Sequence, residues 1–115
     1  MIVKGTKQLG NFKRGINLYV PKKRTVVLRV VIFGAGTVTS NGEYVWDGGS
    51  VGWENKPAYF NGFNSITYNF DNTVAYWSLY DEVIGDSAYR SNDLITWTID
   101  YGEPEAPTST LFYTP

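Results

Sequence analysis

Apolar and polar residues alternate in short runs along most of the chain, and Gly, Asn and Asp separate these runs. The alternation is clearest over residues 65–70 and 74–80, on either side of Asp71 and Asn72. A period of two places successive side chains on opposite faces of a strand, so the pattern predicts a β-hairpin with one buried face. Further short strands are predicted at residues 43–46, 57–60, 87–90 and 93–100.

The strongest strand signal covers residues 25–33, which are almost continuously apolar and β-branched. A strand that is apolar on both faces needs cover on both. Two interpretations stay open at this point. Residues 25–33 form either a central strand of the body or a strand buried at a subunit interface.

The chain changes character along its length, and we predict four parts. Residues 1–33 form a basic N-terminal arm with strands for docking or assembly, and residues 34–40 a Gly/Thr/Ser hinge. Residues 41–101 form an aromatic β-module, and residues 102–115 a Pro-rich tail whose apolar residues 111–113 are expected to dock. Aromatics at 17% and 12 glycines favour an all-β fold. We expect a small antiparallel sandwich or partly open barrel with an extended basic arm.

Charge is segregated along the sequence. Residues 1–42 hold 8 basic and no acidic residues, whereas residues 43–115 hold 2 basic and 11 acidic residues. A basic arm of this kind is suited to an acidic protein surface, and the acidic body argues against nucleic acid as the partner. The arm would pair by β-augmentation or strand exchange through residues 16–20 and 25–33. The predicted docking residues are Lys4, Lys7, Phe12, Lys13, Arg14, Leu18, Tyr19, Lys22, Lys23 and Arg24.

The residues that usually carry catalysis are scarce. The chain has no Cys and no His, which excludes thiolate metal sites, Ser-His-Asp and Cys-His pairs, and disulfides. Asp81 and Glu82 are adjacent, so on a strand they would face opposite sides, and we interpret them as a solvated turn. No catalytic residue, metal or cofactor is predicted. No apolar run is long enough for a membrane helix, and the N-terminus lacks a signal core, so a soluble protein is expected.

Exposed aromatic rings offer a different function, because flat rings stack on sugar faces. The candidates are Trp46, Trp53, Tyr76 and Trp97. Most aromatics at alternating strand positions belong to the core, but Trp53 lies in a loop between Gly52 and Glu54. Trp53 and Tyr76 are the possible glycan contacts. The alternative function is therefore a carbohydrate-binding adhesin module that contacts the host cell surface.

The order of several short motifs resembles a small β-module that recurs in bacteriophage virion proteins and in some bacterial and invertebrate surface proteins. The motifs are Asn-Gly-x-Tyr at residues 41–44, Asn-Lys-Pro-x-Tyr at 55–59, Ile-x-Tyr at 66–68, Trp-x-x-x-Asp at 77–81 and Tyr-x-Ser at 89–91. The pattern spans about residues 36–110. It departs from the usual form at Asn55, where a Gly is expected before Lys-Pro.

The resemblance implies a non-enzymatic virion structural protein, either a capsid decoration (cement) protein or a tail- or fibre-associated protein. Its partners would be other virion subunits, and it would be a homo-oligomer or bound to a lattice of subunits. Its location would be the virion, assembled in the cytoplasm of the host bacterium.

Overall fold

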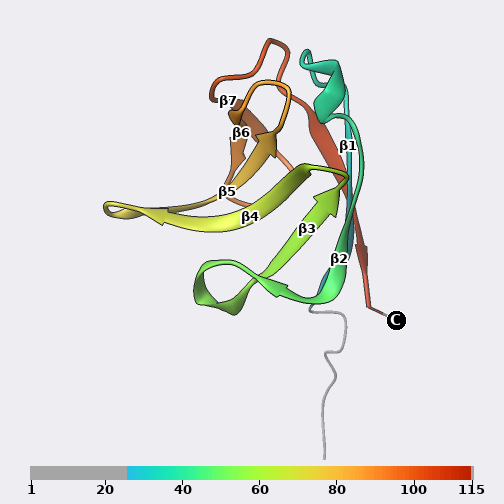
Figure 1. The fold of residues 1–115 in the computed structure, drawn as a ribbon, viewed down its shortest axis with the longest axis vertical. Coiled ribbons are helices and arrows are strands. Elements are labelled where there is room, and N and C mark those ends of the chain that lie inside the picture. Colours follow the sequence, from blue (N-terminus) through green and yellow to red (C-terminus); the bar gives the residue numbers. More distant parts are fainter. Residues whose placement is uncertain (1–25, 115) are drawn as a thin grey trace, which may run out of the picture.

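The structure is a computed structural model that describes residues 26–114 (Figure 1). These residues form one antiparallel sheet of eight strands and two 3-10 helices, with no α-helix among them. The strands are β1 Val27–Phe33, β2 Gly42–Val51, β3 Pro57–Asn61, β4 Asn64–Asp71, β5 Val74–Asp81, β6 Asp86–Ser91, β7 Trp97–Ile99 and β8 Thr108–Tyr113. The 3-10 helices are η2 Val38–Ser40 and η3 Trp53–Asn55. The all-β prediction is confirmed.

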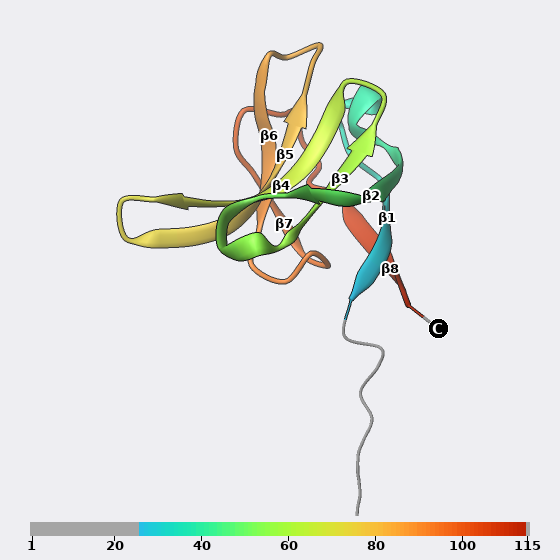
Figure 2. The ribbon, with the colours of Figure 1, turned by 60° about the horizontal axis from the view of Figure 1, so that its bottom comes forward.

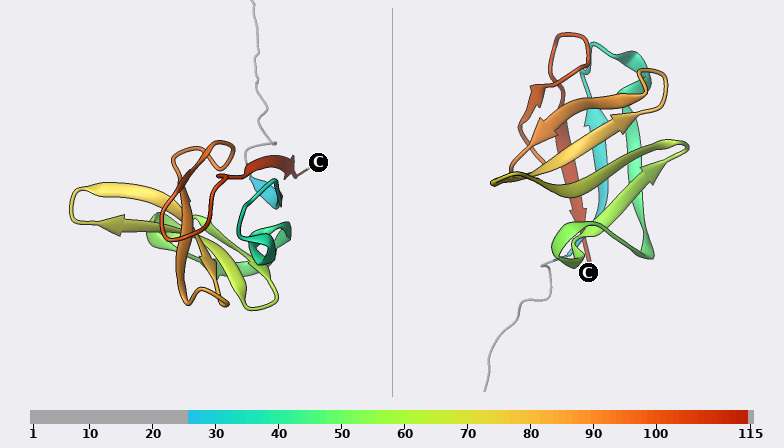
Figure 3. Two further views of the ribbon diagram at one scale, coloured as in Figure 1. Left: turned by 90° about the horizontal axis from the view of Figure 1, so that it is seen from above. Right: turned by 60° about the vertical axis from the view of Figure 1, so that its left-hand side comes forward.

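The sheet curls into a nearly closed barrel, the second of the two predicted forms (Figures 2 and 3). Each strand from β1 to β7 pairs with the next one in sequence, and β8 returns to pair with β1. The remaining seam lies between β7 and β8. It is held by a single bridge between Thr96 and Thr108 and by a 3.0 Å hydrogen bond from Trp97 Nε1 to Ser109 Oγ.

The inner face of the barrel is filled with aromatic and branched side chains. Alternate residues of each strand point inward, as the period of two predicts. Tyr44 and Tyr59 are fully buried, and their hydroxyls donate to the carbonyls of Ser40 at 2.7 Å and Val27 at 2.8 Å. The fully or largely buried core residues are Val30, Ile32, Ala35, Tyr44, Tyr59, Ile66, Trp77, Leu79, Ala88, Tyr89, Leu94 and Trp97.

The strand predicted over residues 25–33 is β1, and it is a central strand of the barrel. It pairs with β2 on one edge and β8 on the other. Val30 and Ile32 are buried, whereas Phe33 on the outer side is 49% exposed. Because both edges of β1 are already hydrogen-bonded, this strand is not free for β-augmentation, and that part of the predicted docking mechanism is wrong.

The two segments predicted as a hinge and a tail are attached to the barrel. Within residues 34–40, the Thr37 N–H donates to the Tyr89 hydroxyl at 3.0 Å, and that hydroxyl donates to the Glu103 carbonyl at 2.6 Å. Residues 102–115 contain β8, in which Leu111 lies opposite Val30. Residues 111–113 therefore dock by pairing with β1, but only Leu111 packs against the core, and Phe112 and Tyr113 stay exposed.

A buried carboxylate joins the β1–β2, β3–β4 and β5–β6 connections. Asp81 is 0% exposed, and its Oδ2 accepts hydrogen bonds from Thr39 Oγ1 at 2.9 Å and Ser40 Oγ at 2.7 Å. Its Oδ1 accepts the N–H of Val83 at 2.9 Å, and Asn64 Nδ2 lies 3.3 Å from Oδ2. The interpretation of Asp81 as a solvated residue is wrong, because these donors replace water around the charge.

Candidate functional site

The ten predicted docking residues, from Lys4 to Arg24, lie outside the described residues, so their role stays a prediction. The structure does show where this segment joins the barrel. It leads into β1 at Val26, beside the C-terminal end of β8, where Thr114 N–H donates to the Val26 carbonyl at 3.0 Å.

The formal charges of the two parts are opposite. Residues 26–114 carry 3 basic and 11 acidic side chains, a net charge of −8. Residues 1–25 carry 7 basic and no acidic side chains, a net charge of +7. The N-terminal segment is therefore complementary to an acidic surface of the kind that the barrel itself has.

A row of apolar side chains crosses the outer face of β8, β1, β2 and β3. The register places Phe112 opposite Arg29, Arg29 opposite Val45, and Val45 opposite Phe60. Phe112 is 40% exposed, Val45 42% and Phe60 39%. We call these three residues the apolar outer row. Exposed apolar groups aligned over neighbouring strands are typical of protein interaction surfaces.

The charge within this row is compensated. The guanidinium carbon of Arg29 lies 4.1 Å from the centre of the Phe112 ring, and the same guanidinium forms an ion pair with Glu43. Both charged side chains are about two fifths exposed, so the pair contributes only about 0–1 kcal/mol to stability. Its main effect is to leave the row without a net charge.

Trp53 is held against the inner face of β4. Its ring stacks on Phe70, with centroids 4.7 Å apart, and on Tyr68 at 5.9 Å. Gly52 allows this approach, because a Cβ there would lie 2.7 Å from the Tyr68 carbonyl oxygen. Trp53 keeps 41% of its surface exposed. The prediction that this tryptophan is exposed is confirmed, and its stacking fixes the orientation of the ring.

Tyr76 lies on the outer face of the β4–β5 hairpin, whereas Trp53 packs on its inner face. Tyr76 is opposite Asn69 on the outer side, whereas Tyr68, which Trp53 contacts, is opposite Trp77 on the inner side. The guanidinium of Arg90 lies over the Tyr76 ring at 4.3 Å. The two predicted glycan contacts are therefore not part of one site.

The surroundings of Tyr76 include residues that the sequence pattern did not single out. Arg90, Asn92 and Thr98 border the same pocket as Tyr76. They come from β6, from the β6–β7 connection and from β7, so no local motif groups them with β5. The register, with Ser78 opposite Arg90 and Arg90 opposite Thr98, is what brings them together.

In residues 26–114, no three His, Cys, Asp or Glu side chains are grouped so that they could hold a metal ion. No helix in this part of the chain is long and apolar enough to cross a membrane.

Comparison with known protein families, with curated proteins and with solved structures finds no match for the chain. The resemblance to virion modules therefore rests on the motifs of residues 36–110.

Proposed function

We propose that the chain is a non-enzymatic structural protein of a bacteriophage virion, either a capsid decoration (cement) protein or a tail- or fibre-associated protein. It attaches to other virion subunits. The observation that carries the proposal is that the basic segment directly precedes β1 of an acidic barrel. β1 lies between the strands that carry Phe112 and Val45 of the apolar outer row. The motifs of residues 36–110 supply the assignment to a virion.

The apolar outer row supports attachment because it crosses β1, the strand that follows the basic segment in the sequence. Phe112, Val45 and Phe60 are each about two fifths exposed, and burying the rest of these side chains against a partner is favourable. The segment of residues 1–25 would contact acidic groups of the same partner, which adds orientation and a faster association rate. On a lattice of identical subunits, several weak contacts of this kind bind together more strongly than each one alone.

Deleting residues 1–20 tests the docking role of the basic segment. The truncated protein is expected to stay soluble and folded, because β1 begins at Val27 and no described strand is removed. It is expected to remain in the supernatant when full-length protein sediments with purified particles. If the truncated protein sediments with the particles to the same extent, the proposed docking role is wrong.

A surface variant tests the apolar outer row in the same assay. Phe60→Ser is expected to weaken particle binding about tenfold, because it removes an aromatic contact from the row. Phe63→Ser is the matched control, since Phe63 is 84% exposed but lies in the β3–β4 turn, outside the row. Equal binding by both variants would contradict the use of this face.

A second candidate function is a carbohydrate-binding adhesin, and Trp53 is the observation that favours it. The ring is held in a fixed orientation by Phe70 and Tyr68, and part of it is open to solvent. A preorganised flat ring loses little entropy when a sugar stacks on it.

The adhesin hypothesis is tested on a glycan array with the full chain. An adhesin that acts through Trp53 loses binding in Trp53→Ala and keeps it in Tyr101→Ala, a control at a ring that is 66% exposed in the β7–β8 connection. If the unaltered protein binds no glycan on the array, the adhesin hypothesis is wrong and the structural role is favoured.

A further inference from the structure

A pocket of about 280 Å³ opens on the outer face of the barrel, between β5 and the connection from β6 to β7. Val74 and Tyr76 form one wall, and Asn92, Asp93 and Thr96 the other. The volume is close to the lower limit of ordinary ligand pockets, so it suits one small molecule or one residue of a polymer.

The wall that carries Asn92 is fixed in place before any ligand binds. Asp93 Oδ1 accepts the N–H of Ile95 at 2.9 Å and of Thr96 at 2.8 Å, and these backbone bonds hold the pKa of Asp93 below its usual value. Leu94 takes a left-handed backbone conformation with φ 68° and buries its side chain in the core. A pocket built on such a loop needs little ordering when it binds.

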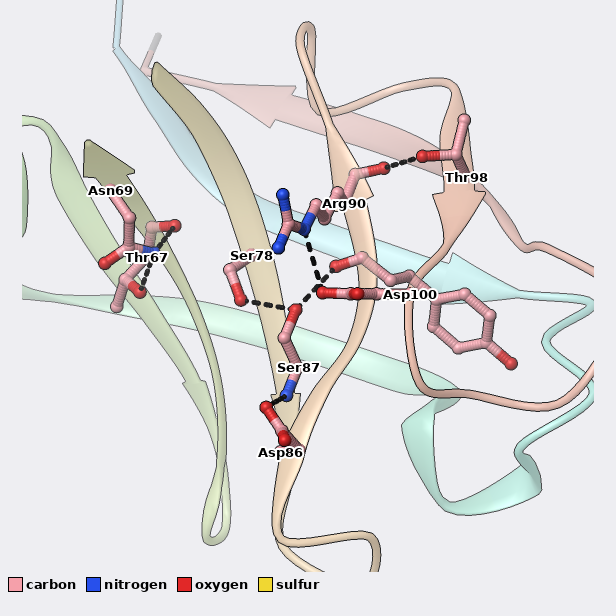
Figure 4. Close-up of polar contacts among 9 residues, drawn as sticks. Thr67, Asn69, Ser78, Asp86, Ser87, Arg90, Thr98 and Asp100 are labelled. Atoms are coloured by element: carbon pink, nitrogen blue, oxygen red, sulfur yellow. Dashed lines mark hydrogen bonds and ion pairs between the residues drawn. The ribbon is translucent and has the colours of Figure 1, made fainter. Parts of the chain in front are cut away.

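Arg90 and Thr98 border the pocket from β6 and β7. The Arg90 Nε donates to Asp100 Oδ2 at 2.8 Å, as Figure 4 shows, and its guanidinium lies over the Tyr76 ring. These two contacts fix the plane of the guanidinium. Within the described residues its Nη atoms donate no hydrogen bond, so they are available to a ligand.

Several other polar groups around the pocket make no hydrogen bond with the described part of the chain. They are the Asn92 amide, the second carboxylate oxygen of Asp93, and the hydroxyls of Tyr76 and Thr96. Together with Arg90 they supply both donors and acceptors. A ligand with neighbouring hydroxyls matches such a set, because each hydroxyl both donates and accepts.

The charges favour a neutral ligand. The positive charge of Arg90 is offset by Asp100, to which it is bonded, and Asp71 also acts on it. Asp93 adds a further negative charge at the rim. With no excess of positive charge, the pocket has little attraction for a phosphate or a carboxylated sugar.

We propose that this pocket binds a neutral saccharide, with Arg90, Asn92 and Asp93 bonding its hydroxyls and with Val74 and Tyr76 contacting its C–H groups. The site is separate from Trp53, which lies on the opposite face of the β4–β5 hairpin. Saccharide binding in this pocket does not depend on the proposed attachment to a virion. Virion attachment is tested separately, by sedimentation with particles.

The test uses the full chain on an array of neutral glycans that also carries their sialylated and uronic-acid counterparts. Binding to a subset of the neutral glycans is expected, and Asn92→Ala should lower that signal at least tenfold. Asn92 is exposed and has no side-chain partner among the described residues, so this variant should fold normally. Asp93→Asn, which keeps a carbonyl oxygen for the loop N–H groups, should lower the signal as well.

Two controls separate this pocket from the rest of the surface. Thr67→Val alters an outward-facing residue of β4 that does not line the pocket, and Trp53→Ala alters the other face of the hairpin. Both should keep the signal that Asn92→Ala loses. The proposal is overturned if no neutral glycan binds, if only acidic glycans bind, or if Asn92→Ala and Asp93→Asn bind as the unaltered protein does.

Discussion

Replacing Asp81 by alanine is expected to lower the free energy of unfolding by about 1–3 kcal/mol. The substitution leaves the buried Ser40 hydroxyl without its acceptor, whereas the Thr39 hydroxyl and the Val83 N–H belong to exposed residues and can turn to water. Each buried donor that loses its partner costs about 1–3 kcal/mol. Because small domains unfold at about 5–15 kcal/mol, the variant should lose a substantial part of its stability.

Urea unfolding of the purified variants provides the measurement. Glu82→Ala is the matched control, because Glu82 is adjacent and, within residues 26–114, only its backbone N–H makes a hydrogen bond, to Asn64 Oδ1. It should change the unfolding free energy by less than about 0.5 kcal/mol. A loss of similar size in both variants would show that the carboxylate of Asp81 is not what holds these connections together.

Low pH should weaken the hydrogen bonds that the Asp81 carboxylate accepts. Burial raises the pKa of Asp81, but the hydrogen bonds from Ser40, Thr39 and Val83 outweigh it, so the pKa lies below the usual carboxyl value. The unfolded chain then takes up a proton at a higher pH than the folded chain does. The stabilisation by Asp81 is therefore present above about pH 4 and is lost as the pH falls further. In Asp81→Asn, this part of the acid dependence should be missing.

Alkaline pH is expected to unfold the barrel through Tyr44 and Tyr59. Burial raises the pKa of each hydroxyl from 10.0 to about 12. Between these values the unfolded chain releases the phenolic protons while the folded chain keeps them, so stability falls as the pH rises. The slope is at most about 1.4 kcal/mol per pH unit for each tyrosine, and both together remove about 4–5 kcal/mol by pH 12.

The decisive comparison is urea unfolding at several pH values above about 8, with tyrosinate absorbance followed in parallel. Tyr59→Phe should have a lower stability at neutral pH, because the Val27 carbonyl loses its donor, and about half the alkaline slope. Tyr101→Phe is the matched control for the loss of a hydroxyl and should leave the stability at neutral pH nearly unchanged, since Tyr101 is 66% exposed. If Tyr59→Phe has an unchanged slope, the buried hydroxyl is not the titrating group.

Local patterns predicted the parts of the fold that local hydrogen bonding determines. The hairpin expected over residues 65–70 and 74–80 is β4 and β5, and the turn between them uses a positive φ at Asn72, as its Asp-Asn sequence indicates. The strand expected at 93–100 is shorter and begins at Trp97. The reason is that the Asp93 side chain takes the N–H groups of Ile95 and Thr96, which a ladder would otherwise use.

The parts that were not predicted depend on contacts between distant residues. β8 pairs with β1 at the other end of the sequence, and no local pattern shows that pairing. Asp81 appeared solvated because charged residues in turns usually are, and its donors come from three separate connections. The pocket at Tyr76 likewise combines three strands and a loop. Sequence reasoning found one of its residues and could not find the others.

The start of β1 and the end of β8 lie side by side, and this affects how the protein can be fused to other domains. The Thr114 N–H donates to the Val26 carbonyl, so the point where β1 continues from the segment proposed to dock lies beside the end of β8. The β4–β5 hairpin instead projects away from the barrel (Figure 1), and its turn at Asn72 is exposed. A peptide to be carried by this protein is therefore better inserted at this turn than fused after β8.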